Sequence, residues 1–509
     1  MQTDIQDSPR TLDDLPPHAR DLLLRSLDWS AQFWDDEHSL LVLPDKAGDL
    51  RPTIRRSGYF ALGLLLRGRE GDVEQARKIL RKVIDFQFDE PGAVYHGTFY
   101  RYTDEDHPPA DAQQWKDYDP NWRQFIGTTL AVIREAFSAQ LDEALIERID
   151  HAIQLAVAGE PADRCQPHYT NIGLMKSALM TWAGHRYGRP DWFAAGESFA
   201  EAVYEIFSEH GAFLEYNSPT YYGVNFYALG LWQQYSHSSK LAAWGTEVEA
   251  LLWRDVARYY HADLKNMCGP YTRSYGMNML DYSALLGLDI WCACGAEHAP
   301  HPQTGTSFGH AADSVFAPCI AMLGVRVPED VASHFVSYAG PRQIEQRIAT
   351  HPDRVATAWL DETWMIGAER TALDGDPADQ FCSGLVGQYH AATLHWQMPD
   401  GQIAWMRLQH AGPVRAVASA GRLDITGKVD GSLLERFGDR HYDYIFIFSI
   451  PGGIAPSVFH AEQWQLPGLA LTMQTECAMP FIEFEEDLIH LRYRVSADMP
   501  RPRFVIDIV

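Results

Sequence analysis

The chain is 509 residues long, which is more than one compact hydrophobic core usually contains, so we expect two or three domains. Its 42 Lys and Arg stand against 68 Asp and Glu, for a formal net charge of -26, and this excess of negative charge argues against nucleic acid and against an anionic membrane surface as partners. The sequence begins without a signal-like segment, has no apolar run of membrane-spanning length, and scatters seven Cys along the chain. We therefore expect a cytoplasmic protein.

Residues 15–312 are predicted to be helical, because apolar residues recur there at three- and four-residue spacing. The ten predicted helices are 18–34, 57–67, 72–88, 122–138, 142–158, 170–187, 191–208, 220–236, 243–262 and 278–294. So many helices without a sequence repeat of fixed period indicate an (α/α) toroid, in which inner helix ends line a central cleft. A plain bundle or a solenoid is the alternative.

Beyond residue 312 the sequence changes to short alternating or β-branched segments separated by Gly, Pro and Asp. These segments are 319–325, 354–370, 390–396, 402–410, 442–450, 469–479 and 488–496. They predict an antiparallel β-sandwich. The expected fold class is therefore α+β multidomain, with a tail at 1–14, a catalytic toroid at 15–312 and a β-sandwich at 313–509.

Polar and aromatic residues crowd into 209–232, EHGAFLEYNSPTYYGVNFYALGLW, directly before a predicted helix. A helix N-terminus presents unpaired N–H groups and partial positive charge, which suits a carboxylate or an oxyanion. The alternative is an aromatic helix start that only packs in the core. Glu215 and Asn217 favour a site, because an apolar core has little use for them. Tyr221 and Tyr222 point about 100° apart on a helix, so we expect only one of them to face the cleft.

Four segments occur in a suggestive order: YDPNWRQFIG at 118–127, HYTNIGLMKSAL at 168–179, GAFLEYNSPTYYGVNF at 211–226 and GPYTRSYGMNM at 269–279. In order and spacing they resemble the catalytic toroid of polysaccharide lyases of the chondroitin AC and hyaluronate lyase type, and more loosely of the heparinase II/III type. Those families have a helical toroid followed by antiparallel sheets. The resemblance covers about residues 115–280 and the domain order, and it implies a uronate-containing oligosaccharide substrate.

The resemblance also implies roles for single residues. Asn171 matches the Asn that neutralises the uronate carboxylate, Tyr221 or Tyr222 the Tyr that takes the proton α to it and protonates the leaving oxygen, and Arg273 the Arg that steadies the charges. A Tyr of ordinary pKa near 10 can act as a base where an adjacent cation favours the phenolate. The residues expected to bind sugar are Asn121, Trp122, Tyr216, Asn217 and Tyr275.

One departure from the lyase pattern concerns the base. Those lyases carry a His shortly after a Gly-Ser-Phe segment, where this chain reads Leu214, Glu215, Tyr216, Asn217. His168, from the preceding segment, is the nearest candidate to replace it. Taken alone, His168 is more readily explained as a structural residue.

Two other functions stay open. An inverting glycoside hydrolase acting on a glucuronide would use Glu215 with Asp281 or Asp119 as two carboxylates roughly 6.5–9.5 Å apart. A non-catalytic sugar-binding protein would use the same aromatic residues only for binding. The candidate lyase residues could also be structural, since Asn171 is well placed as a helix cap and Arg273 for pairing with Asp281 or Asp263.

No cofactor and no metal is expected. His390, His395 and His410 lie on predicted strands, but their spacing matches no known ligand pattern. The glycine-containing segments lack the order of a phosphate-binding loop. Whether the chain forms a homo-oligomer is left open by the sequence.

Overall fold

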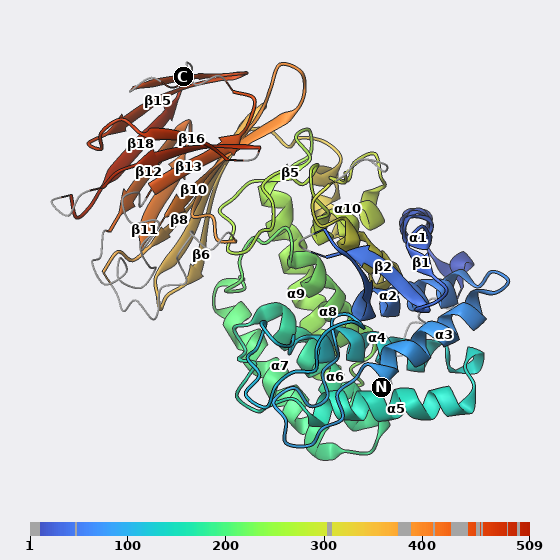
Figure 1. Ribbon diagram of the computed structural model, residues 1–509. Helices are drawn as coiled ribbons and strands as arrows, with labels where there is room; N and C mark the ends of the chain where they lie inside the picture. The colour runs from blue at the N-terminus through green and yellow to red at the C-terminus, as the bar shows by residue number, and fades with distance from the viewer. Residues whose placement is uncertain are drawn as a thin grey trace.

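The computed structural model describes residues 11–45, 48–302, 308–374, 388–410, 413–428, 446–454, 459, 462–485, 487–495 and 499–509. A helical part precedes a part built from antiparallel strands (Figure 1). The α-helices are α1 (Pro17–Ala31), α2 (Ile54–Arg67), α3 (Asp72–Asp85), α4 (Trp122–Ala136), α5 (Glu143–Ala158), α6 (Thr170–Arg186), α7 (Pro190–His210), α8 (Tyr222–Gln234), α9 (Ser239–Tyr259), α10 (Leu285–Cys294), α11 (Ala317–Leu323) and α12 (Glu329–Ala332). Each of the ten predicted helices overlaps one of α1 to α10, so all ten are confirmed.

Local sequence explains where several of these helices begin and end. Asp142 accepts the N–H of Leu145 at the start of α5, and Ser238 accepts the N–H of Leu241 at the start of α9. These side chains satisfy donors that a helix start leaves unpaired. After α7 the chain leaves the helix at Gly211 with φ 66°, a left-handed conformation that glycine adopts without steric cost.

The helices form two concentric layers. The inner helices α2, α4, α6, α8 and α10 pack on one another in that order, and α1 closes the ring by packing on both α10 and α2. Outside them, α3, α5, α7 and α9 pack on α2, α4, α6 and α8. The inner helix α8 is buried continuously from Tyr222 to Trp232, whereas the outer helix α7 buries a single stripe. The helical part is therefore an (α/α) toroid, as the sequence predicts.

The strand part is one branched, fully antiparallel sheet. Its strands are β6 (Arg342–Ala349), β7 (Arg354–Leu360), β8 (Trp364–Thr371), β9 (Ala392–Gln397), β10 (Ile403–His410), β11 (Val414–Ser419), β12 (Arg422–Gly427), β13 (Phe446–Pro451), β14 (Gln463–Leu466), β15 (Leu469–Thr475), β16 (Phe481–Glu485), β17 (Leu488–Tyr493) and β18 (Arg503–Ile508). Short strands also lie within the helical part: β1 (Trp34–Asp35), β2 (Leu40–Pro44), β3 (Leu50–Thr53), β4 (Tyr260–His261) and β5 (Asn266–Met267).

The sheet branches at β8 and folds into two layers. One arm runs β6-β7-β8-β9-β10-β13-β17-β16, and the other leaves β8 through β11 and continues β12-β18-β15-β14. Aromatic rings from the two arms meet between them: Phe504 of β18 lies 5.4 Å from Phe446 and Phe448 of β13, and 5.0 Å from Tyr493 of β17. The strands therefore enclose a core of their own, and the expected β-sandwich is confirmed.

One predicted strand is wrong. Residues 319–325 lie largely in helix α11, because a short apolar run of this length is equally compatible with a buried helix and a buried strand. The other predicted strands coincide with β7 and β8, β9, β10, β13, β15 and β17, although 442–445 lie outside the described residues, as do residues 1–10 of the expected tail.

Helical elements continue to Phe335 and the first strand of the sheet begins at Arg342. The division at residue 312 stays a prediction, and we propose that the boundary lies between Phe335 and Arg342.

The first arm of the sheet packs on the helical part. Buried Arg354 of β7 pairs with Glu369 of β8 at 2.6 Å and donates to the carbonyl of Leu214 at 3.0 Å. Tyr271 and His390 exchange backbone hydrogen bonds of 3.1 and 2.8 Å. The loops at 211–221 and 269–279 are therefore held against the sheet.

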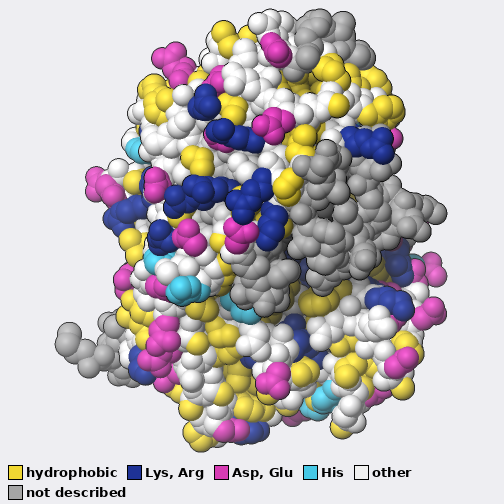
Figure 2. Space-filling model, turned by 90° about the vertical axis from the view of Figure 1, so that its left-hand side faces the viewer, with side chains coloured by type: hydrophobic (Ala, Val, Ile, Leu, Met, Phe, Trp, Pro, Cys, Tyr) yellow, Lys and Arg dark blue, Asp and Glu magenta, His cyan; other side chains and the backbone are white. Residues whose placement is uncertain are grey.

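The second arm of the sheet, β11-β12-β18-β15-β14, carries charges of both signs. Figure 2 views the molecule from the side on which Figure 1 shows β11, β12 and β18, and Lys and Arg lie there among Asp and Glu. Arg422 of β12 pairs with Asp507 of β18 at 3.0 Å, and Arg503 of β18 pairs with Asp424 of β12 at 3.1 Å. These arginines are therefore neutralised across neighbouring strands.

Within the described ranges, no helix is both long and apolar enough to cross a membrane.

Candidate functional site

The carboxylate of Glu215 lies at the N-terminal end of the inner helix α6. Its Oε2 accepts hydrogen bonds from Nδ2 and the backbone N–H of Asn171, at 2.8 and 3.2 Å, and its Oε1 accepts one from Nη1 of Arg273 at 2.6 Å. The Glu215 side chain is only 4% exposed. Three donors and the positive end of the α6 dipole compensate for burying this charge.

Arg273 uses its whole guanidinium inside the site. Besides Glu215, it donates from Nη2 to the hydroxyl of Tyr221 at 2.7 Å and from Nε to Oε1 of Gln388 at 3.1 Å. It also lies 3.9 Å from the centroid of the Tyr221 ring. Burial alone would lower the pKa of Arg273, but the charge and hydrogen bond of Glu215, together with the phenols of Tyr221 and Tyr169, raise that pKa above its ordinary value. A permanent cation therefore touches a phenol oxygen.

Two neighbours of Glu215 hold the loop that carries Arg273. Asn217 has φ 48°, a left-handed conformation that Asn tolerates better than most residues. Its Nδ2 donates to the carbonyls of Cys268 and Pro270, both at 2.8 Å, and Ser218 Oγ donates to the carbonyl of Arg273. Asn217 is fully buried, so its expected role as a sugar ligand is wrong, because its amide fixes the loop instead.

Of the two adjacent tyrosines, Tyr221 faces the site and Tyr222 faces the core. The Tyr221 hydroxyl accepts from Arg273 and shares a 2.5 Å hydrogen bond with the hydroxyl of Tyr275. Tyr222 is 1% exposed, and its hydroxyl accepts the backbone N–H of Asn217 at 2.5 Å. The expected catalytic role of Tyr222 is therefore wrong, because its hydroxyl is used inside the core.

The environment favours the neutral phenol at both Tyr221 and Tyr275. Burial raises the pKa of Tyr221 well above its ordinary value, and Tyr275 adds to the rise while Arg273 opposes it. Burial likewise raises the pKa of Tyr275. Both hydroxyls thus keep a proton that they can give away, and Arg273 can stabilise the phenolate left behind at Tyr221.

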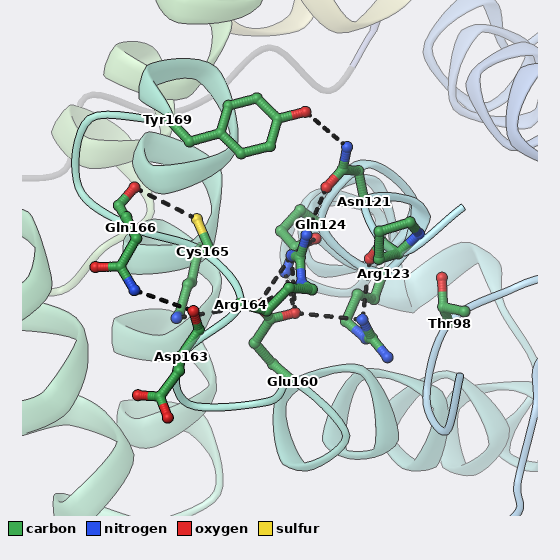
Figure 3. Close-up of polar contacts among 12 residues, drawn as sticks. Thr98, Asn121, Arg123, Gln124, Glu160, Asp163, Arg164, Cys165, Gln166 and Tyr169 are labelled. Atoms are coloured by element: carbon green, nitrogen blue, oxygen red, sulfur yellow. Dashed lines mark hydrogen bonds and ion pairs between the residues drawn. The ribbon is translucent and has the colours of Figure 1, made fainter. Parts of the chain in front are cut away.

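A second buried network lies at the start of α4 (Figure 3). Glu160 accepts from Nε of Arg164 at 2.9 Å and from Nη1 of Arg123 at 3.4 Å. Arg164 also donates to Oδ1 of Asn121 at 2.7 Å, and Asn121 donates from Nδ2 to the hydroxyl of Tyr169 at 2.9 Å. Asn121 is only 7% exposed and both ends of its amide are used. Asn121 therefore orients Tyr169. As at Asn217, the expected role as a direct sugar ligand is wrong, because the buried amide is used inside the protein.

Tyr169 links the two networks. It directly precedes helix α6, and its ring centroid lies 5.9 Å from the Arg273 guanidinium. Burial raises the pKa of Tyr169, with Arg273 opposing the rise. Tyr169 lies within the segment HYTNIGLMKSAL but was not among the predicted site residues. Its position directly before a helix, beside Asn171, was the available signal.

Arg55 is a cation of the site that was not predicted from the sequence. It lies in the first turn of α2, with its guanidinium 5.0 Å from the ring centroid of Trp122 and 4.8 Å from that of Phe125. Its buried Nε has no hydrogen-bond partner among the residues that the structure describes. Burial would lower the pKa of Arg55, but surrounding phenols and carboxylates, Asp313 among them, raise it. Trp122, which is 5% exposed, thus supports a cation and offers little surface to a sugar ring.

Three further candidates differ in their surroundings. Tyr216 is buried and donates to Asp255 at 2.9 Å, so its expected role in binding sugar is wrong. His168 is exposed, and its ring has no polar partner within the described part of the chain. Asn171 is 1% exposed, and its amide nitrogens are directed at Glu215, so it anchors that carboxylate rather than a substrate.

The predicted strand histidines His390, His395 and His410 are all buried. Searching the described residues finds no group of three or more His, Cys, Asp or Glu arranged to hold a metal ion. The side chains gathered around Glu215 and Arg273 are phenols, amides, guanidinium groups and one carboxylate.

Comparison with solved structures finds distant similarity to two lyases. A chondroitin AC lyase from Streptomyces coelicolor A3, in complex with chondroitin sulphate, has 11% sequence identity and a TM-score of 0.45, over 97% of this chain and 79% of that one. A mutant of heparan sulfate lyase HepC from Pedobacter heparinus has 10% identity and a TM-score of 0.32, over 100% of this chain and 84% of that one.

No curated protein matches the sequence. One family model does match, over residues 20–325, which run from α1 to just beyond α11. That stretch contains Arg55, Glu215, Tyr221 and Arg273. It is more than half of the chain, and the chain therefore belongs to the family described as Domain of unknown function (DUF8769).

Proposed function

We propose that this protein is a carbohydrate-active lyase, which cleaves a uronate-containing oligo- or polysaccharide by β-elimination at the N-terminal ends of the inner helices. The observation that carries the proposal is the contact of the Tyr221 hydroxyl with Arg273, whose guanidinium is itself fixed by buried Glu215. A phenol beside an immobile cation is equipped to transfer a proton while negative charge develops next to it.

Elimination of this kind has two demands. The carbon-bound proton α to a carboxylate is too weakly acidic unless the charge that builds up on that carboxylate is stabilised. The departing glycosidic oxygen also needs a proton. Arg55 and Arg273 supply fixed positive charge. The three hydrogen bonds of Arg273 are made within the site, whereas Nε of Arg55 is buried without a hydrogen-bond partner among the described residues.

Tyr221 can supply the proton that the departing glycosidic oxygen needs. Since its pKa is raised, the hydroxyl is a neutral phenol near neutral pH and suits proton delivery to the leaving oxygen. This differs from the sequence-based expectation, in which the same Tyr first removes the sugar proton. We therefore assign the proton-delivering role to Tyr221 and leave the base role to a second group.

The structure gives less support to a hydrolase. The Glu215 carboxylate is occupied by Arg273 and Asn171. The two partner candidates are also engaged, since Asp281 accepts from Asn278 Nδ2 at 2.8 Å and Asp119 accepts the N–H of Asn121 at 2.9 Å. A hydrolase would require one of these carboxylates to leave its present partner.

A screen of uronate-containing oligosaccharides tests the proposal. Elimination creates a C4=C5 double bond that absorbs in the ultraviolet and yields products that have gained no water, which mass spectrometry detects. Products heavier by one water and without absorbance would identify a hydrolase. Binding without turnover would identify a sugar-binding protein.

Two adjacent tyrosines provide a matched pair of variants. Tyr221→Phe should lower kcat by about 10²- to 10⁴-fold, the usual contribution of a proton-transferring group. Tyr222→Phe should leave kcat near that of the wild type and instead lower stability by about 1–3 kcal/mol, because the N–H of Asn217 then lacks an acceptor. Loss of turnover in Tyr222→Phe but not in Tyr221→Phe would contradict the assignment.

A further inference from the structure

His310 lies beside the candidate site, although it is remote from the other site residues in sequence. The preceding Gly309 is pinned to the loop at 281–283, since its N–H donates to the carbonyl of Asp281 at 3.0 Å and its carbonyl accepts the N–H of Ser283 at 2.9 Å. His310 itself has φ 54°, a left-handed backbone conformation that only a few per cent of non-glycine residues adopt. Such conformations concentrate at functional sites.

A carboxylate orients the His310 ring. Nδ1 of His310 lies 3.5 Å from Oδ2 of Asp313, while Oδ1 of Asp313 accepts from Nη2 of Arg56 at 2.9 Å. Burial would raise the pKa of Asp313, but the contacts with His310 and Arg56 lower it well below its ordinary value. An ionised carboxylate at Nδ1 leaves Nε2 as the nitrogen that can accept a proton.

The ring is also in contact with the proton-donating tyrosines. It stacks on Tyr275, with centroids 4.3 Å apart and planes 13° apart, and Tyr275 hydrogen-bonds Tyr221. The His310 side chain is 34% exposed, so a substrate can reach it. Within the described part of the chain, Nε2 has no hydrogen-bond partner.

We propose that His310 is the catalytic base of the elimination and that Asp313 is its positioning residue. This rests on the proposed lyase function and deepens it, because it names the group that accepts the sugar proton while Tyr221 delivers one to the leaving oxygen.

The resulting reaction balances. The Nε2 lone pair accepts the proton from the carbon α to the uronate carboxylate, and the C–H electron pair becomes the new C=C bond. The C–O bond to the leaving sugar breaks, and its oxygen takes the proton of the Tyr221 hydroxyl. The imidazolium then returns one proton to the phenolate, through Tyr275 or water, and no water enters the product.

Asp313 is the group that orients the His310 ring. It lies at the edge of the ring and Tyr275 on its face, and the ring of Tyr282 lies 6.5 Å away. Arg56 reaches the ring only through Asp313, and Arg55 contributes positive charge beside Tyr275. Asp313→Asn should therefore lower kcat and leave KM near that of the wild type, because the ring loses the carboxylate that orients it.

Histidine variants test the proposal in the full-length protein. His310→Asn keeps a side chain that suits φ 54° and should lower kcat by about 10²- to 10⁴-fold. His310→Gly also fits that backbone, and added imidazole should restore part of its turnover. His298→Asn is the matched control, since His298 is 32% exposed and lies 3.9 Å from Glu297, and it should turn over like the wild type.

The outcomes separate this inference from the function on which it rests. Elimination by the wild type, with loss in His310→Asn and rescue of His310→Gly by imidazole, supports both. Elimination by the wild type that survives in His310→Asn within about threefold overturns the base assignment and leaves the lyase function standing. Hydrolysis or binding alone by the wild type overturns the lyase function and the base assignment together.

Discussion

Replacing Glu215 by Gln tests whether this carboxylate holds the site together or carries out chemistry. Its two oxygens accept from different donors, Oε1 from Arg273 and Oε2 from Asn171. A glutamine side chain has only one acceptor oxygen. Whichever way the amide turns, its NH₂ group faces one of these donors, so the variant loses a charge and at least one hydrogen bond.

The expected cost of Glu215→Gln follows from burial. Neutralising one partner of a buried ion pair typically destabilises a protein by about 3–5 kcal/mol. The Glu215 side chain is 4% exposed, but that of Arg273 is 22% exposed, so water can partly solvate the cation left behind. We therefore expect a loss of about 3 kcal/mol, measured as a lower urea midpoint of unfolding followed by tryptophan fluorescence.

Glu249→Gln is a suitable control, because Glu249 has the same three kinds of donor. It accepts from the side-chain amide of Gln233 and from the backbone N–H and guanidinium of Arg326, and it lies on the outer helix α9. This variant should lose less stability, since the Arg326 side chain is 38% exposed, and should keep its turnover. Glu215→Gln with the wild-type urea midpoint but no turnover would refute the reasoning and make Glu215 a catalytic acid.

Two further predictions concern stability and substrate binding. Burial raises the pKa of Asp255 from 3.8 to about 6. Between about pH 4 and 6 the folded state therefore keeps a proton that the unfolded state has released. The free energy of unfolding of the wild type should fall by about 3 kcal/mol as pH rises through that window. Melting temperatures across pH should show this fall in the wild type and not in Asp255→Asn. Arg55→Gln should raise KM for an anionic oligosaccharide about 10- to 100-fold, because a charge-assisted hydrogen bond contributes about 1.5–3 kcal/mol. Arg51→Gln, which removes a cation already paired with Asp104 at 2.9 Å, should not, and an unchanged KM in Arg55→Gln would exclude that residue from substrate binding.

The helices were predictable because each is long enough to show its period. A run of fifteen or so residues with apolar positions three and four apart is compatible with little besides a helix. The segment at 319–325 is too short for its period to be recognised, so its apolar content predicted a strand although it forms α11. The expectation of a sandwich still held, because it rested on many segments and not on one.

The site was predictable only where its residues are neighbours in sequence. The crowded stretch before α8 contains both Glu215 and Tyr221. Which of two adjacent tyrosines enters the core depends on how the start of the helix is rotated. Asn217 fixes that rotation, because its backbone N–H donates to the hydroxyl of Tyr222 and its side-chain amide donates to the loop ahead of Arg273. Sequence spacing contains no signal for such a contact. Arg55 and His310 lie far from that stretch in the chain, so only the closed ring of helices brings them near it.

The sheet part takes part in this arrangement. Arg273 donates from Nε to the side chain of Gln388, and the N–H of the next residue, Ser274, donates to the Gln388 carbonyl at 2.8 Å. Two residues further along, His390 exchanges backbone hydrogen bonds with Tyr271. Gln388 and His390 lie outside the 20–325 span that defines the family, and yet they fix the loop whose guanidinium sets the position and the electrostatics of Tyr221. The helical ring supplies the groups of the proposed site, but the sheet holds the loop of Arg273 in place, so the arrangement requires both parts of the chain.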